Sequence, residues 1–190
     1  MVQRHNLWYL IPNILTIARL CLVLPIVQLL RNEHYPLAFG LAFIAMLSDA
    51  LDGYLARRFN WRTELGAFLD PVADKTMMIS LFVTLGWIGH LPLWIVAVVV
   101  GRDLFILSGV TLYRIWQGAL QVQPTFSGKL STLLQMSLMS WALLILAFDW
   151  VGTGWPIILD ALMVLVVIAA VVSAADYFWV GMMKSSKRRE

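Results

Sequence analysis

The sequence has 190 residues, of which 61% are hydrophobic and 13% are charged, and its formal net charge is +3. Soluble globular domains contain about 45–50% apolar and about 25% charged residues. This composition therefore excludes an ordinary soluble domain and indicates an integral membrane protein, and the single cysteine, Cys21, excludes a framework of internal disulfides.

Six apolar runs follow one another along the chain, and each is long enough to cross a bilayer as a helix, which takes roughly 20 residues. The runs leave no room between them for a soluble domain. We therefore predict one all-α membrane domain over residues 1–190, with six transmembrane helices and a short interfacial helix within MVQRHNLWYLIPN. The predicted spans cover about 10–30, 35–57, 69–89, 92–115, 130–149 and 155–180.

Lysine and arginine residues predict the orientation of these spans, because cytoplasmic loops carry an excess of both. They place both termini in the cytoplasm. Because no targeting segment is recognised before the first run, we expect a bacterial inner membrane. The basic residues of the cytoplasmic side are Arg4, Arg57, Arg58, Arg62, Arg114, Lys129, Lys184, Lys187, Arg188 and Arg189.

Four aspartates lie near the neighbouring ends of the second and third predicted helices. Asp49 and Asp52 are three residues apart, and Asp70 and Asp74 are four apart. Residues at these spacings share one face of a helix, and the linker between the helices is short. The sequence therefore predicts that four carboxylates converge near the cytoplasmic surface.

Two nearby residues complete the prediction for this region. Pro71 fits the first turn of a helix, where Asp70 would either cap the helix or bind a metal. Glu64, the fifth acid of the region, is expected in the linker and exposed to solvent.

Four clustered carboxylates repel one another unless cations lie among them. Sites made only of oxygen ligands suit Mg²⁺ or Mn²⁺, and four carboxylates are enough to hold two such ions for phosphoryl displacement. One alternative is that the acids are plain interfacial charges. A second alternative is a transporter, since acids within a membrane often mark ion pathways. Clustering at one interface beside Arg57 favours phosphate chemistry over transport.

The segment DALDGYLARRFNWRTELGAFLDPVAD fits the pattern D-x2-D-G-x2-A-R-x8-G-x3-D-x3-D at all its fixed positions. In this it resembles the CDP-alcohol phosphotransferase family, and the resemblance extends to IPNILTIAR and SGKLSTLLQ. It implies a membrane enzyme with the six-helix fold of that family, usually a homodimer. Such an enzyme transfers a phosphatidyl or similar group from a CDP-linked donor to an alcohol and releases CMP.

The resemblance also implies roles for individual residues. Asp74 would be the general base, and two divalent cations, Mg²⁺ or Mn²⁺, would be held by Asp49, Asp52, Asp70 and Asp74. The CDP-linked donor would be bound by Asp49, Asp52, Gly53, Ala56, Arg57 and Gly66.

Three further cations are candidates for binding the acceptor: Arg19, Arg102 and Lys129. A cation within a span is unfavourable unless it faces a polar cavity. Asp103 directly follows Arg102, but adjacent residues do not face each other on a helix. We therefore expect a poor pair between these two residues and a phosphate-binding role for Arg102 and Lys129.

Two branches of the family differ in the acceptor. The opening NLWYLIPNILTIARL resembles both phosphatidylglycerophosphate synthases and cardiolipin synthases, which act on glycerol-3-phosphate and phosphatidylglycerol respectively. The former typically carry Arg-Glu and a second arginine eight positions after the first, whereas this chain has Asp103 after Arg102 and Val110 at the later position. The sequence therefore resembles cardiolipin synthases more closely. The expected partners are CDP-diacylglycerol, the acceptor and membrane lipids, and no nucleic acid.

Overall fold

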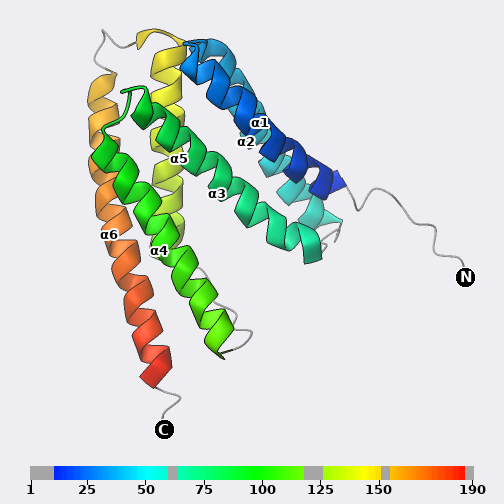
Figure 1. Ribbon diagram of the computed structural model, residues 1–190, viewed down its shortest axis with the longest axis vertical. Helices are drawn as coiled ribbons and strands as arrows, with labels where there is room; N and C mark the ends of the chain where they lie inside the picture. The colour runs from blue at the N-terminus through cyan, green and yellow to red at the C-terminus, as the bar shows by residue number, and fades with distance from the viewer. Residues whose placement is uncertain (1–10, 60–63, 118–125, 151–154, 187–190) are drawn as a thin grey trace, which may run out of the picture. The chain divides into compact units, whose positions relative to one another are not determined.

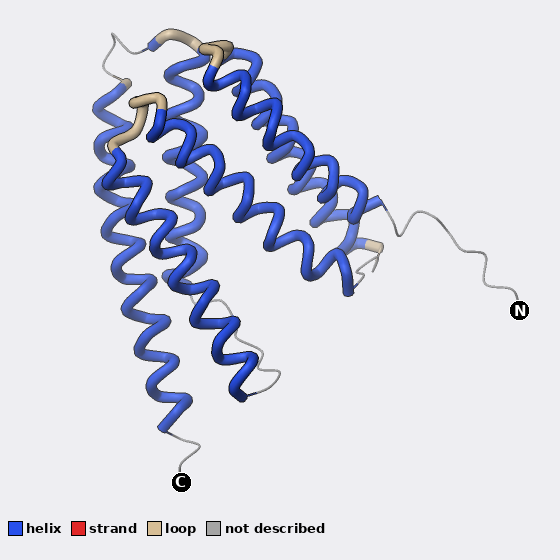
Figure 2. Tube along the Cα trace, viewed as in Figure 1, coloured by secondary structure: helices blue, strands red, loops and turns tan. Residues whose placement is uncertain are grey.

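The computed structural model describes residues 11–59, 64–117, 126–150 and 155–186. Within these ranges the chain is helical with short turns and has no strand, as Figure 2 shows. The predicted all-α class is confirmed for this part of the protein. The predicted interfacial helix within residues 1–13 falls largely outside it.

Each predicted apolar run coincides with a helix. The described helices are α1 (Ile11–Arg31), α2 (Tyr35–Arg58), α3 (Glu64–Trp87), α4 (Leu93–Gln117), α5 (Phe126–Ala147) and α6 (Pro156–Ser186). The start of α3 departs from the prediction, because this helix begins at Glu64 and the predicted span at about residue 69. Glu64 is therefore the first helical residue, and its predicted place in the linker is wrong. An acid at this position is favourable, since the amino end of a helix carries partial positive charge.

The early start of α3 also changes the interpretation of Asp70. Asp70 and Pro71 lie inside α3 and not in its first turn, so Asp70 does not cap the helix. A proline inside a helix removes one backbone hydrogen bond. The prediction was wrong because it took the helix to begin at about residue 69, whereas residues 64–68, ELGAF, are helical too.

The chain divides into two compact units, each described by itself. The first contains residues 1–85 and 146–148, and the second contains residues 86–145 and 149–190. In the first unit α1 and α2 pack side by side and run antiparallel, as Figure 1 shows. Their buried apolar residues include Val23, Ile26, Leu30, Ala38 and Ala45. This hairpin fixes Arg19 and Asp49 in one unit.

The turn between α1 and α2 is closed by backbone hydrogen bonds. The amide of His34 donates to the carbonyl of Leu29 at 2.9 Å, and the amide of Glu33 donates to the carbonyl of Leu30 at 3.2 Å. This is the Schellman arrangement, which satisfies carbonyls at a helix end and requires a left-handed residue. Glu33 is that residue, with φ of 61°.

In the second unit α4 and α6 lie side by side and run in the same direction (Figure 1). The turn from α3 into α4 is left-handed at Gly89, with φ of 85°. A Cβ on Gly86 would lie 2.7 Å from Cγ2 of Val96, so the absence of a side chain there allows the end of α3 to approach the start of α4 closely.

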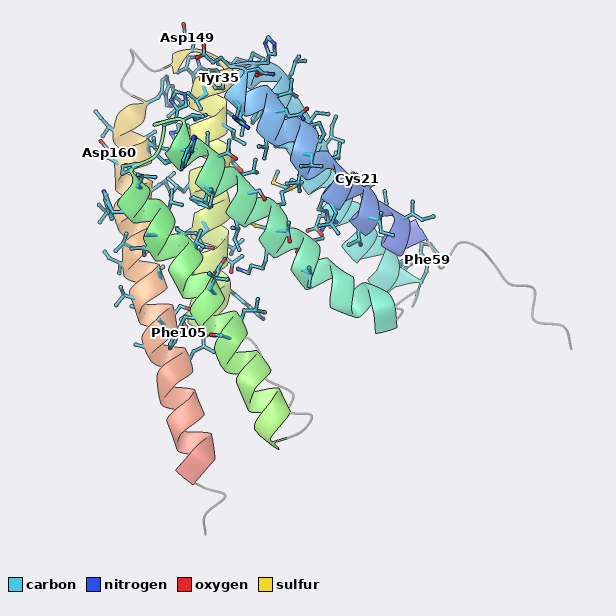
Figure 3. The ribbon with its side chains drawn as sticks, in the orientation of Figure 1. Cys21, Tyr35, Phe59, Phe105, Asp149 and Asp160 are labelled. Atoms are coloured by element: carbon cyan, nitrogen blue, oxygen red, sulfur yellow. The ribbon has the colours of Figure 1, made fainter. Side chains whose placement is uncertain are left out.

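The outer surface of the helices is apolar, as expected for a protein surrounded by lipid. Large apolar side chains are exposed on every helix, and Phe105 on α4, labelled in Figure 3, is one of them. Within the described ranges three segments are long and apolar enough to cross a membrane: Ile14–Arg31, Phe126–Ala147 and Ile157–Tyr177. The protein is therefore an integral membrane protein.

Candidate active site

Arg19 of α1 joins two of the predicted site aspartates. Its NH1 atom lies 2.6 Å from Oδ1 of Asp49 on α2 and 2.5 Å from Oδ1 of Asp74 on α3. A single nitrogen thus bridges two carboxylates that are 25 positions apart in the sequence. The prediction that acids of the second and third helices converge is confirmed for this pair.

The electrostatics of this cluster follow from its burial. The Arg19 side chain is only 2% exposed, whereas those of Asp49 and Asp74 are 37% and 39% exposed. A buried guanidinium needs counter-charges because burial without them is costly. The two carboxylates supply these charges and keep an open side toward solvent.

The other predicted residues of the motif lie on the same two helices. Asp52, Gly53, Ala56 and Arg57 belong to α2, and Gly66 and Asp70 belong to α3. The side chains at these positions lie outside the described part of the structure. Their helical spacing relative to Asp49 and Asp74 agrees with the prediction, because α2 and α3 are continuous across the motif.

The residues present fit a divalent cation. Asp49 and Asp74 are hard oxygen ligands, which Mg²⁺ and Mn²⁺ prefer, and they already share one cation, the Arg19 guanidinium. Among the described side chains no group of three or more potential metal ligands gathers. The side chains of Asp52 and Asp70 are not among those described, so this search does not include the full predicted set.

A second polar cluster lies in the other unit, where Arg102 joins three helices. Its NH1 atom donates to Oδ1 of Asp103 at 2.7 Å. Its NH2 atom donates to the hydroxyl of Ser173 on α6 at 2.6 Å and to the carbonyl of Gly128 on α5 at 3.4 Å. Arg102 therefore ties α4 to both neighbouring helices.

The pairing of Arg102 with Asp103 corrects the expectation that adjacent residues would pair poorly. The side chains are 7% and 2% exposed, so neither charge can be solvated by water. The guanidinium of Arg102 reaches the carboxylate of the adjacent residue at 2.7 Å, and burial leaves each charge in need of a partner.

The third predicted acceptor residue, Lys129, lies in the first turn of α5 and is exposed. The described contacts do not connect it with Arg102. The side chain of Val110, on which the comparison of branches depended, lies outside the described part of the structure.

Sequence reasoning missed several polar residues of the second unit. Ser131 and Gln135 on α5 and Ser173 on α6 are all fully buried. The sequence analysis considered only charged residues within the apolar runs, so it did not single out these neutral side chains. Their signal was their place within one helix face, since Gly128, Ser131 and Gln135 are three and four residues apart.

Comparison with known proteins agrees with the motif. The family model described as CDP-alcohol phosphatidyltransferase matches residues 9–175, which is most of the chain. The protein belongs to the CDP-alcohol phosphatidyltransferase family. The family resemblance inferred from the aspartate motif is thereby confirmed.

Several relatives with assigned names are similar to this chain. A human protein named cardiolipin synthase (CMP-forming) is 29% identical over 193 aligned residues, which cover 93% of this chain and 63% of the human protein. A Streptomyces coelicolor protein of the same name is 38% identical over 76% of this chain and 67% of its own length. A Mycobacterium tuberculosis protein named probable phosphatidylglycerophosphate synthase is 37% identical over 65% of this chain and 60% of its own length.

The similarity covers only part of these relatives. A Drosophila melanogaster protein named probable cardiolipin synthase (CMP-forming) is matched over 35% of its length. The chain therefore spans from about a third to two thirds of the relatives named here.

Proposed function

We propose that this protein transfers a phosphatidyl group from CDP-diacylglycerol to the hydroxyl of phosphatidylglycerol, forming cardiolipin and CMP. The observation that carries the donor half is the bridge of Arg19 between Asp49 and Asp74, because it joins the two halves of the family motif. The names of the human and Streptomyces relatives support this acceptor.

In the proposed reaction an oxygen of the acceptor hydroxyl attacks the phosphorus that carries diacylglycerol. The new phosphate–oxygen bond forms while the bond to CMP breaks, and CMP leaves with the bridging oxygen. Asp74 takes the hydroxyl proton as general base, which requires its carboxylate to come within about 3 Å of that hydroxyl. Its exposed fraction of 39% leaves the carboxylate accessible to substrate.

We further propose that Asp49, Asp52, Asp70 and Asp74 hold two divalent cations, Mg²⁺ or Mn²⁺, against the donor diphosphate. When bound, these ions would neutralise charge that develops on the leaving CMP. On the same helices, Gly53, Ala56 and Gly66 would leave room for the cytidine, and Arg57 would contact phosphate.

The charge state of the second cluster favours a phosphodiester acceptor. The charge of Arg102 is balanced by Asp103 within the protein, so little of it remains for a ligand. A phosphodiester carries one negative charge, whereas glycerol-3-phosphate carries nearly two and needs more cations. Lys129, which is exposed, remains available for this one charge.

The second candidate is transfer to glycerol-3-phosphate, as in a phosphatidylglycerophosphate synthase. The Mycobacterium relative of that name favours it, since its identity to this chain is similar to that of the Streptomyces protein. Under either acceptor we propose that all six helices cross the membrane as one domain and that two copies form a homodimer. We place both termini and the site on the cytoplasmic face of a bacterial inner membrane.

The test is an assay of the purified protein with CDP-diacylglycerol and each acceptor in turn, measuring CMP and identifying the lipid product. Cardiolipin formed from phosphatidylglycerol supports the proposal. Release of CMP only with glycerol-3-phosphate would overturn the cardiolipin assignment in favour of the second candidate. No CMP with any acceptor, together with ion flux in proteoliposomes, would favour a transporter.

The same assay tests the proposed metal. Activity is expected to disappear in EDTA and to return with excess Mg²⁺ or Mn²⁺. Undiminished activity in EDTA would contradict the two-cation proposal, whichever acceptor is used.

A further inference from the structure

The guanidinium of Arg19 lies between two of the proposed metal ligands. Its NH1 atom is 2.6 Å from Oδ1 of Asp49 and 2.5 Å from Oδ1 of Asp74. All three residues belong to the first unit. One oxygen of each carboxylate is therefore held by a cation that the protein itself supplies, and any metal ion has to bind beside this charge.

The surroundings of Arg19 make its charge important. Arg19 lies inside Ile14–Arg31, a segment long and apolar enough to cross a membrane, and its side chain is only 2% exposed. Charges interact more strongly in an apolar environment than in water, because the dielectric constant is lower. A buried charge also needs a partner of opposite sign. The guanidinium therefore has reason to stay with Asp49 and Asp74 when another cation approaches them.

The charges of the proposed site can be compared. The four aspartates of the motif carry four negative charges, which two divalent cations alone would balance. Arg19 adds one positive charge that two of these same acids already balance. With both ions bound, the acids and Arg19 together would carry an excess of positive charge. The diphosphate of a CDP-linked donor is negatively charged and would remove this excess.

We propose that Arg19 couples the binding of divalent cations to the binding of the donor. Without the donor, Arg19 weakens cation binding by Asp49 and Asp74, because it neutralises part of their charge. With the donor bound, the diphosphate compensates for Arg19, and the acids hold the cations tightly. This rests on the proposed function and deepens it, because it makes Arg19 a positioning residue that determines when the metal site fills.

A purely structural role for Arg19 is the competing explanation. Arg19 would then only connect α1 with α2 and α3 and keep two metal ligands in place. Its removal would disorder these ligands, so the protein would bind cations more weakly. Under our proposal the removal of Arg19 strengthens cation binding in the absence of donor. The two explanations therefore predict changes of opposite sign.

The test measures the affinity of the full-length protein in detergent for Mn²⁺, using the electron paramagnetic resonance signal of unbound Mn²⁺. Each titration is made without ligand, with CDP and with cytidine. CDP carries a diphosphate like that of the donor, whereas cytidine has the same base and sugar without phosphate and is the control ligand. A titration of CDP with Mn²⁺ in the absence of protein corrects for ions bound by free CDP.

The variants are Arg19→Met, which removes the charge, and Arg19→Lys, which retains it. Arg31→Met, at the exposed end of the same helix, is the matched control. In the wild type CDP should raise the affinity for Mn²⁺ about tenfold or more, and Mn²⁺ should raise the affinity for CDP by the same factor. Cytidine should leave the affinity for Mn²⁺ unchanged.

In Arg19→Met the affinity for Mn²⁺ without CDP should rise about tenfold, and CDP should then raise it much less than in the wild type. Arg19→Lys should retain most of the coupling, because it retains the charge. Arg31→Met should behave like the wild type.

Weaker or unchanged Mn²⁺ binding by Arg19→Met without CDP would overturn the proposal, and weaker binding would favour the structural role. A wild type whose Mn²⁺ affinity does not respond to CDP, or responds equally to cytidine, would overturn it as well. If Arg19→Met does not fold, Arg19→Gln and the wild-type comparison of CDP with cytidine decide the question.

The binding measurement needs no turnover, so its outcome is separate from that of the proposed reaction. Coupling that depends on Arg19 in a protein that forms no CMP with any acceptor would support this role and contradict the proposed reaction. CMP formation by a protein in which Mn²⁺ and CDP bind independently would do the reverse.

Discussion

The NH1 atom of Arg19 donates a hydrogen bond of 2.5 Å to Oδ1 of Asp74, across 55 positions of sequence. The same atom lies 2.6 Å from Asp49. The family motif contains both aspartates but not Arg19, so the cation that joins its two halves comes from a helix outside it. The sequence predicted Arg19 as an acceptor-binding residue, and its described contacts support a role in holding the two aspartates together.

Replacing Arg19 with methionine should lower the free energy of unfolding and increase the stabilisation that divalent cations provide. The substitution removes the cation that Asp49 and Asp74 share, leaving two carboxylates to repel each other. Breaking a buried pair costs about 3–5 kcal/mol, and we expect roughly 2 kcal/mol here because both carboxylates are more than a third exposed. The measurement is thermal unfolding with EDTA and with Mn²⁺.

The variant should gain more stability from Mn²⁺ than the wild type gains, because the metal becomes the main cation available to these acids. Arg19→Lys should be intermediate, since a lysine keeps the charge but not the planar donor geometry. Arg31→Met, at the exposed end of α1, is the matched control and should behave like the wild type. An equal Mn²⁺ response in Arg19→Met and wild type would contradict this account.

Replacing Asp74 with asparagine should abolish CMP formation while the protein remains folded. Asparagine can still accept the hydrogen bond from Arg19 through its amide oxygen, but it cannot take a proton from the acceptor. General base catalysis typically contributes 10²–10⁴-fold, and we expect a loss of at least about that size. The measurement is CMP release at saturating donor.

Asp160→Asn provides the control for this substitution, because Asp160 is exposed near the start of α6 and is labelled in Figure 3. It should retain wild-type activity. Near-normal turnover in a folded Asp74→Asn protein would remove Asp74 from the role of base.

The sequence predicted the helices well because apolar runs of this length have few alternatives in a membrane. It was less accurate at Glu64 and Asp70, because α3 begins at Glu64, five residues before the predicted span. The first residue of a helix depends on the helix propensity and charge of individual residues, and the position of an apolar run does not reveal these local effects. The true start of α3 therefore required the structure.

Some contacts of the site were predicted from the sequence and others were not. The helical spacing within each pair of aspartates and the short linker between their helices predicted that the acids converge, and the contacts of Asp49 and Asp74 with Arg19 agree. The pairing of Arg102 with Asp103 was missed. The rule that adjacent helical residues point in different directions does not account for the length and flexibility of an arginine side chain. The burial of Gln135 depends on how α5 packs against other helices, which no local pattern contains.

The pair formed by Arg102 and Asp103 should show strong coupling in a double-mutant cycle. Each single change, Arg102→Met or Asp103→Leu, leaves one buried charge without its partner, and such changes typically cost about 3–5 kcal/mol. The double variant removes both charges and should be less destabilised than either single variant. The measurement is the free energy of unfolding in denaturant, and purely additive effects would contradict a mutual pair.

Glycine at position 33 should stabilise the protein. Glu33 occupies the left-handed region, with φ of 61°, which costs a residue with a side chain roughly 1–2 kcal/mol. Glycine removes this cost but makes the unfolded chain more flexible by about 0.4–1 kcal/mol. We therefore expect Glu33→Gly to raise the free energy of unfolding by roughly 0.5–1 kcal/mol, measured by thermal or denaturant unfolding in detergent. A loss of stability would show that the Glu33 side chain contributes more than its backbone costs.

Alanine at position 89 should have the opposite effect, for the same physical reason. Gly89 has φ of 85°, and a Cβ there would meet nothing within 4 Å, so the backbone conformation alone penalises a side chain. We expect Gly89→Ala to destabilise the protein by roughly 1 kcal/mol.

Gly40 is the matched control, because it lies inside α2 and its Cβ would also meet nothing within 4 Å. Alanine favours a helix interior over glycine by about 1 kcal/mol, so Gly40→Ala should be stabilising. Two substitutions of identical chemistry should therefore shift the unfolding temperature in opposite directions, and a shift of the same sign would contradict the left-handed turn at Gly89.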